Sequence, residues 1–119
     1  MRDNNKSIVA LVTAYNKKVL YTGDIDKLDE LRVVNSTLKS GGGTVALLKD
    51  LYILKVAHHG SDGSSGDSFI KYVSPEISVV SVGKNNYGHP SPRVLDLLTT
   101  ASSTIYRTDT AGNIIFRIQ

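Results

Sequence analysis

The sequence predicts a single α/β domain built around a mixed sheet. Short, β-branched apolar segments alternate with helical patterns in the order ββαβαβαββ along the 119 residues, which is typical of a layered α/β domain. This length supports one core and does not require a second domain. Hydrophobic residues make up 40% of the chain and charged residues 21%, as in ordinary globular domains. We therefore expect residues 1–119 to form one domain with a mixed sheet and about three helices.

Hairpins are expected at both ends of the chain, because apolar strand-like segments there flank short polar turns. The predicted segments are 7–15, a turn at 16–18 and 19–22 near the amino terminus, and 104–107, a turn at 109–113 and 114–118 near the carboxyl terminus. Both hairpins would contribute strands to the sheet.

A helix is predicted after the first hairpin. Asp26 can cap its first turn, and the glycines at 41–43 mark its end. Apolar residues recur at helical spacing within it, namely Leu28, Leu31, Val34 or Asn35, and Leu38. We expect this leucine stripe to pack on the sheet.

Two further strands and two further helices complete the pattern. The strands are expected at 52–57 and 76–82, and a short helix at 67–73 ends before Pro75. Ser91 can cap the last helix, since the following proline suits the first helical position. The residues expected to face the core are Phe69, Ile70 and Val73 in the short helix, and Val94, Leu95, Leu97 and Leu98 in the last one.

Charge and cysteine content narrow the possible partners. The net charge of +3 and the pI near 9.2 mildly favour a polyanionic partner, although the basic residues are scattered. Cysteine is absent, which excludes disulfides and thiolate metal ligands. No apolar run approaches the roughly 18 residues that span a bilayer, and no signal-peptide pattern opens the chain. We expect no membrane insertion by this segment.

Residues that can bind a metal or transfer a proton follow three of the predicted strands. Asp24 comes after Gly23 at the end of the first hairpin, where a carboxylate can cap the next helix or bridge cations. His58 and His59 come directly after the strand at 52–57. His89 follows the strand at 76–82 and could donate a proton to a leaving group or bind an oxyanion. These side chains are candidates for one shared site.

Adjacent residues on a strand point to opposite sides, so only one of the two neighbouring histidines is expected to face the site. His58 continues the face of Leu54 and Val56, whereas His59 continues the face of Lys55 and Ala57. This alternation favours His59 as a metal ligand and His58 as a packing residue, while a turn at this point leaves the opposite assignment open.

Residues 84–87 supply a lysine, two asparagines and a tyrosine of the kind that hold a phosphate.

Four motifs occur in order along the chain: Thr-Gly-Asp at 22–24, His-His-Gly-Ser at 58–61 followed by Ser64 and Ser65, Ser-Val-Gly-Lys-Asn-Asn-Tyr-Gly-His-Pro-Ser-Pro at 81–92, and Tyr-Arg-Thr-Asp at 106–109. Together they resemble the metallo-β-lactamase-fold hydrolase domain of ComEC-type competence proteins. The resemblance covers nearly the whole chain. It implies a four-layered αββα sandwich with a dinuclear zinc or manganese site, and a metal-dependent phosphodiesterase or nuclease that acts in DNA uptake.

The resemblance also implies roles for individual residues. Asp24 would bridge the metals, His59 or else His58 would ligate one of them, and His89 would be the catalytic residue at the scissile phosphate. The residues implied in binding the substrate, DNA or another phosphodiester, are Lys84, Asn85, Tyr87 and Ser61.

One departure limits these expectations. The family's first metal motif, His-x-His-x-Asp-His, belongs upstream of Thr22, and no histidine precedes that residue here. The chain therefore resembles the C-terminal half of the sandwich, which leaves one sheet face exposed for the missing N-terminal half or a homodimer partner. The isolated chain would then be inactive, and a non-catalytic binding or assembly module is the alternative function. Its location would be extracytoplasmic within a ComEC-type protein and cytoplasmic otherwise.

Overall fold

The computed structural model describes residues 6–40 and 46–119, and it contains one mixed five-stranded sheet in the order β1-β2-β3-β4-β5. Strands β2 to β5 run parallel, and β1 is antiparallel to β2. The strands are β1 (Ala10–Ala14), β2 (Lys17–Tyr21), β3 (Ile53–Lys55), β4 (Ile77–Val80) and β5 (Thr104–Arg107). The helices are α1 (Lys27–Ser40), α2 (Asp67–Val73), α3 (Pro92–Thr100) and the short α4 (Thr108–Ala111), with a 3-10 turn η2 (Ala57–Gly60) after β3.

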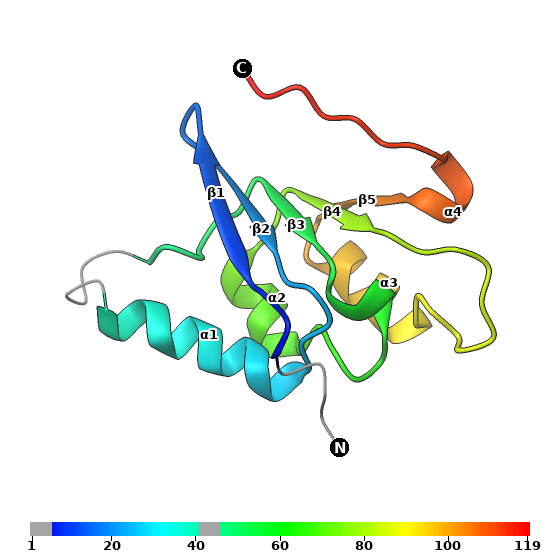
Figure 1. Cartoon of the computed structure of the whole chain (residues 1–119), viewed down its shortest axis with the longest axis horizontal. Helices are drawn as coiled ribbons and strands as arrows, with labels where there is room; N and C mark the ends of the chain where they lie inside the picture. Colours follow the sequence, from blue (N-terminus) through cyan, green and yellow to red (C-terminus); the bar gives the residue numbers. More distant parts are fainter. Residues whose placement is uncertain (1–5, 41–45) are drawn as a thin grey trace.

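Helices α1, α2 and α3 cover one face of the sheet (Figure 1). The core lies between these two layers, where the strands and the helices both contribute fully buried side chains. Its most buried apolar members are Leu20, Leu54, Val56, Ile70, Val73, Val80, Val94 and Leu98. Among the described residues, no helix is long and apolar enough to cross a membrane.

The amino-terminal hairpin turns one residue earlier than predicted. Tyr15 and Asn16 form its turn, with φ angles of 51° and 62°. Two consecutive positive φ values are typical of the primed turns that match strand twist in tight hairpins. Lys17, predicted to lie in the turn, is instead the first residue of β2 and pairs with Ala14.

Two of the predicted helices are confirmed. Helix α2 spans Asp67–Val73 and buries Phe69, Ile70 and Val73, as expected. The Ser91 hydroxyl accepts a hydrogen bond from the Arg93 backbone N–H at 3.2 Å, so Ser91 is the predicted cap of α3. Asp26 likewise caps α1, because its carboxylate accepts from the Asp29 backbone N–H at 2.9 Å.

The predicted apolar stripe of α1 is wrong for its leucines and confirmed for Val34. Leu28 and Leu31 remain 49% and 45% exposed, and Leu38 is exposed as well, whereas Val34 is buried in the core. Glu30 shares the buried face with Val34, and its carboxylate binds backbone N–H groups that fix this rotation of the helix. The predicted helix end at residues 41–43 lies outside the described residues.

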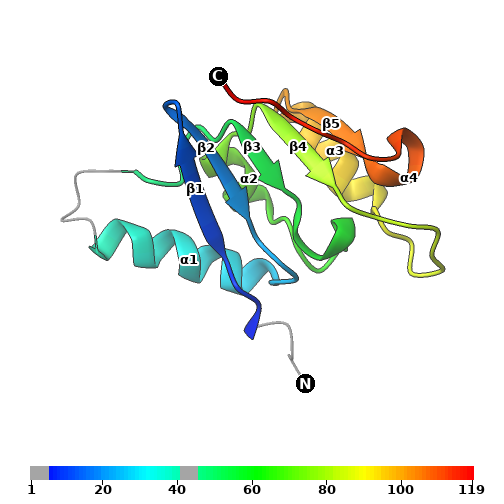
Figure 2. The same ribbon diagram turned by 45° about the horizontal axis from the view of Figure 1, so that its top comes forward.

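The carboxyl-terminal hairpin is also wrong in part. Strand β5 forms as predicted, but α4 replaces the expected turn at 109–113, and residues 114–118 are not a strand. The end of the chain crosses the sheet face opposite the helices, as Figure 2 shows. Phe116 packs edge to face on Tyr106 there, with ring centroids 5.4 Å apart.

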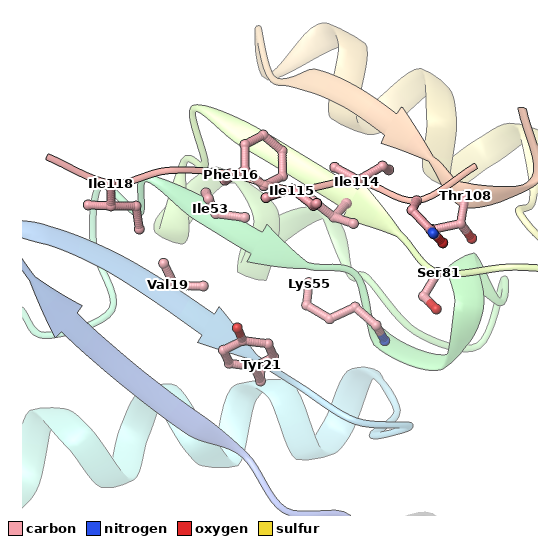
Figure 3. Close-up of a pocket in the computed structure, with 12 residues that line it drawn as sticks. Val19, Tyr21, Ile53, Lys55, Ser81, Thr108, Ile114, Ile115, Phe116 and Ile118 are labelled. Atoms are coloured by element: carbon pink, nitrogen blue, oxygen red, sulfur yellow. The ribbon is translucent and has the colours of Figure 1, made fainter. Parts of the chain in front are cut away.

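A groove of about 680 Å³ separates this segment from the open sheet face (Figure 3). The sheet side of the groove is formed by Val19, Tyr21, Ile53, Lys55, Val79 and Ser81. The structure is thus a sheet with helices on one face and a single extended segment on the other. A four-layered αββα sandwich is not confirmed, since only the sheet and one helical layer are present in the described residues.

Candidate functional site at the carboxyl edge of the parallel strands

The four parallel strands end at the same edge of the sheet, so the loops that follow them lie together. In open α/β sheets this carboxyl edge is the usual place for ligand binding. Asp24 follows β2, His58 and His59 lie in η2 after β3, and His89 follows β4. The topology therefore brings the predicted metal and catalytic residues to one region.

The two histidines do not lie on a strand, because β3 ends at Lys55. His58 and His59 have left-handed backbone angles, with φ of 50° and 56°. The strand alternation that favoured one histidine over the other therefore does not apply. The neighbouring Gly60, with φ of +84°, lies so close to Pro90 that an added Cβ would be 2.5 Å from the proline Cβ. This contact packs η2 against the start of α3.

His59 is oriented by hydrogen bonding toward Asp24. Its Nδ1 lies 2.5 Å from the Ser81 carbonyl oxygen, which can only accept, so Nδ1 carries the hydrogen. The other ring nitrogen, Nε2, consequently faces the Asp24 carboxylate, with Nε2 and Oδ1 4.0 Å apart. The Asp24 backbone N–H donates to the Ser7 hydroxyl, which holds the carboxylate's own loop in place.

Three rings continue this edge from η2 toward the loop after β4. The ring centroids of His58 and His89 are 5.5 Å apart, and those of His89 and Tyr87 are 5.7 Å apart with an interplanar angle of 25°. Burial lowers the pKa of His89 below its usual value, and the neighbouring His58 and His59 lower it further because an added positive charge would be repelled. His89 is therefore mainly neutral at neutral pH.

Asn85 holds the loop at 83–89 in shape. Its side-chain amide donates to the backbone carbonyls of Gly83 and His89, both at 2.9 Å. Its side-chain oxygen accepts from the backbone N–H groups of Tyr87 and His89, at 3.0 and 3.1 Å. These contacts use both donors and both lone pairs of the amide. The predicted contact of Asn85 with substrate remains a prediction, and in this structure the residue organises the loop that presents His89 and Tyr87.

Arg93 clamps the second loop of the site, residues 61–66. Its guanidinium donates to the carbonyl oxygens of Asp62, Ser64 and Ser65 and to the Asp62 carboxylate, at 2.6 to 3.1 Å. Ser61, predicted to bind substrate, accepts from the backbone N–H of Gly63 at 3.2 Å and so forms part of the same loop. Arg93 was not predicted as a site residue, because its position near the Ser91 cap gives no sign of contacts with a loop some thirty residues earlier.

Glu30 supports the same loop from the other side and was also missed. Its buried carboxylate accepts from the backbone N–H groups of Ser65 and Gly66, at 2.6 and 2.8 Å. Burial raises the pKa of Glu30 to about 7, although both hydrogen bonds and nearby Arg93 act in the opposite direction. The sequence contains one indication of this contact. Glu30 stands beside an apolar position of the predicted helix, and the serine pair Ser64 and Ser65 follows later in the chain.

The remaining predicted residue, Lys84, is exposed in the loop at 83–89. Lys55 at the end of β3 also reaches this edge, where its Nζ donates to the Val56 carbonyl oxygen at 3.2 Å. Burial lowers the pKa of Lys55, while the Asp24 carboxylate raises it. The edge thus combines imidazoles, an exposed tyrosine and lysines, and the Asp24 carboxylate lies beside His59.

By themselves, the described residues do not complete a catalytic zinc or manganese site, and metal ligation by Asp24, His59 or His58 remains a prediction. Asp24 and His59 face each other, but they supply two donors, and catalytic zinc sites normally have three protein ligands. Over the described parts of the chain, no group of three or more histidine, cysteine or acidic residues could hold a metal ion. No chemical step is therefore assigned to a metal here.

No family model matches the chain, but three curated proteins are similar to it. ComE operon protein 3 of Bacillus subtilis (strain 168) is 38% identical over 117 residues, which are 96% of this chain and 14% of that protein. Competence protein ComA of Neisseria gonorrhoeae is 36% identical over 96% of this chain and 16% of its own length. Recombination protein 2 of Haemophilus influenzae (strain ATCC 51907 / DSM 11121 / KW20 / Rd) is 28% identical over 94% of this chain and 13% of its own length. The chain therefore spans a small part of each relative.

These findings correct the family assignment made from the motifs. The printed names refer to competence and recombination, and none of them names a hydrolase, a nuclease or a metallo-β-lactamase. In the described part of the chain, the structure likewise has one sheet with helices on one face, and Asp24 and His59 face each other where a metal centre was expected. The assignment to a metallo-β-lactamase-fold hydrolase, and the metal-dependent phosphodiesterase or nuclease activity that followed from it, are withdrawn. The similarity to competence proteins remains.

Proposed function

We propose that this chain is a DNA-binding module of a competence protein and that DNA lies along the carboxyl edge of its parallel strands. The observation that carries the proposal is the convergence of His58, His59 and His89 at this edge, next to the exposed Lys84. The names of two relatives support a role in competence, and hence in DNA uptake. The net charge of +3 favours a polyanionic ligand.

Imidazoles at this edge suit a phosphate ligand that binds reversibly. Burial lowers the pKa of His89, and the neighbouring His58 and His59 lower it further. A DNA phosphate beside His89 would act in the opposite direction, because it stabilises the protonated ring. DNA affinity should therefore rise as the pH falls through the region below 7, and it should fall with added salt.

The proposal describes binding without hydrolysis by the chain itself. It rests on a cluster that offers hydrogen-bond donors and a cation but few oxygen ligands for a metal. Two positioning residues support this cluster. Asn85 holds the loop at 83–89 in shape, and Arg93 holds the loop at 61–66. A module of this kind would hold DNA for another part of the uptake machinery.

Fluorescence anisotropy with a labelled oligonucleotide tests the proposal directly. His89→Ala and Lys84→Ala should each weaken binding several-fold, because each removes a donor to phosphate. Lys49→Ala is the matched control, since Lys49 is an exposed lysine before β3, at the opposite edge of the sheet. Absence of binding, or equal losses in all three variants, would contradict the proposal.

Hydrolysis is checked in the same samples. The oligonucleotide should remain intact on a denaturing gel, with and without added zinc or manganese. Cleavage that is lost in Asp24→Ala would refute a purely binding role.

A further inference from the structure

Tyr87 presents an aromatic ring to solvent with one face already backed by another ring. Its side chain is 83% exposed, yet it stacks on His89 with an interplanar angle of 25°. His89 in turn lies beside His58, with ring centroids 5.5 Å apart and the rings tilted by 59°. The outer face of the Tyr87 ring is the free face of the Tyr87–His89 stack.

The loop that carries Tyr87 is fixed before any ligand arrives. Asn85 bonds to the Tyr87 and His89 backbone N–H groups, which sets the spacing between the two rings. A Cβ added to Gly88, with φ of +79°, would meet no atom within 4 Å, and the same is true of Gly83. A planar ligand can thus approach the loop. Binding would cost little conformational entropy, because the loop is already ordered.

The other highly exposed tyrosine of the described residues shows that this arrangement is not general. Tyr15 is 74% exposed in the hairpin turn between β1 and β2, and within the described chain it stacks on no other ring. Exposure alone is common for single aromatic residues. The backing ring and the fixed loop are what distinguish Tyr87.

We propose that Tyr87 is a stacking platform for an unpaired nucleobase. This inference rests on the proposed DNA-binding function and names its ligand as single-stranded rather than fully paired DNA. A base in a duplex has both faces covered by its neighbours, whereas a base in a single strand can place a free face on an aromatic ring. The phosphates on either side of that base would then lie near Lys84 and the imidazoles.

The experiment compares three probes of equal length by fluorescence anisotropy: an oligothymidine strand, an abasic strand with the same phosphates, and a blunt duplex. The wild-type chain should bind oligothymidine more tightly than the other two. Tyr87→Leu should weaken oligothymidine binding about tenfold and leave abasic binding unchanged. Tyr87→Phe should retain wild-type affinity, because the ring is preserved.

Tyr15→Leu is the control for loss of an exposed tyrosine, and it should leave all affinities unchanged. Equal melting temperatures of the variants would show that the fold is intact. Equal losses for the abasic and oligothymidine strands in Tyr87→Leu, or no loss for either, would overturn the stacking platform while leaving DNA binding in place. Failure of the wild-type chain to bind any probe would overturn both proposals.

Discussion

The two loops that form the site are held in opposite ways. Residues 61–66 are tied to distant parts of the fold, by Glu30 from α1 and by Arg93 from α3. Residues 83–89 are held by their own Asn85, whose four hydrogen bonds all stay within the loop. The first loop follows η2, and the second carries the exposed Tyr87 and Lys84.

This difference separates the loop that is part of the structural framework, residues 61–66, from the loop that forms the ligand-binding surface, residues 83–89. A loop that satisfies its polar groups through the buried Glu30 and the partly exposed Arg93, on two different helices, cannot change without disturbing those helices. A loop that satisfies them internally can move or be replaced as a unit, with little cost to the rest of the fold. The chain therefore builds its site from a rigid base, which positions His58 and His59, and from a self-contained loop that meets the ligand.

Loss of Arg93 should have the largest effect on stability. Arg93→Met removes hydrogen bonds to three backbone carbonyl groups, so the free energy of unfolding should fall by about 2 to 3 kcal/mol. Urea denaturation followed by circular dichroism measures this change. Arg32→Met is the control, because Arg32 is 61% exposed and pairs with Asp29 within its own helix, and its loss should cost less than about 0.5 kcal/mol. Similar values for both variants would remove the distinction between the two loops.

Glu30 should make the anchored loop sensitive to pH. The pKa of Glu30 in the folded state is about 7, above its ordinary value of 4.5, so folding favours its protonated form. The associated stability is fully present below pH 4.5 and is lost as the pH rises through 7. The groups that face this carboxyl are Arg93 and Asp26.

Glu30→Gln should abolish this dependence. The free energy of unfolding of the wild type should fall relative to the variant by up to about 3 kcal/mol between pH 4.5 and 7.5. Urea titrations at four pH values follow this difference. Parallel curves for the two proteins would show that Glu30 does not titrate in this range.

Changes in the self-contained loop should have the smallest effect on stability. Asn85→Ala should lower the free energy of unfolding by less than about 1 kcal/mol, because the loop is exposed and its backbone groups can bond to water. DNA affinity in the anisotropy assay should nevertheless fall several-fold, since Tyr87 and His89 lose their fixed spacing. The neighbouring Asn86→Ala is the control and should change neither quantity. A large stability loss in Asn85→Ala would contradict the division between the loops.

The sequence predicted the elements whose signals are local. The caps Asp26 and Ser91 and the buried face of α2 follow from neighbouring residues, and the structure confirms them. The gathering of Asp24, His59 and His89 at one edge also followed from strand ends, because parallel strands place their carboxyl ends together.

Interactions between distant segments could not be predicted in the same way. The leucine spacing of α1 suggested a buried face, yet Glu30 decides the rotation of that helix through contacts with Ser65 and Gly66. The left-handed backbone of His58 and His59 occurs in a turn whose Gly60 packs against Pro90, a distant contact that strand alternation does not contain. The family assignment from short motifs likewise exceeded what those motifs establish about activity.

The carboxyl-terminal segment combines ordered side chains with an unpaired backbone. Ile114, Phe116 and Ile118 are half-buried, while Ile115 and Arg117 face outward, which is the alternation of a strand. Across residues 6–40 and 46–119, no backbone hydrogen bond involves 114–118. Because side-chain packing and not strand hydrogen bonding holds this segment, it can detach from the sheet one side chain at a time, without a cooperative step. Its amides are also free to template an added strand, so the face opposite the helices is open to self-association.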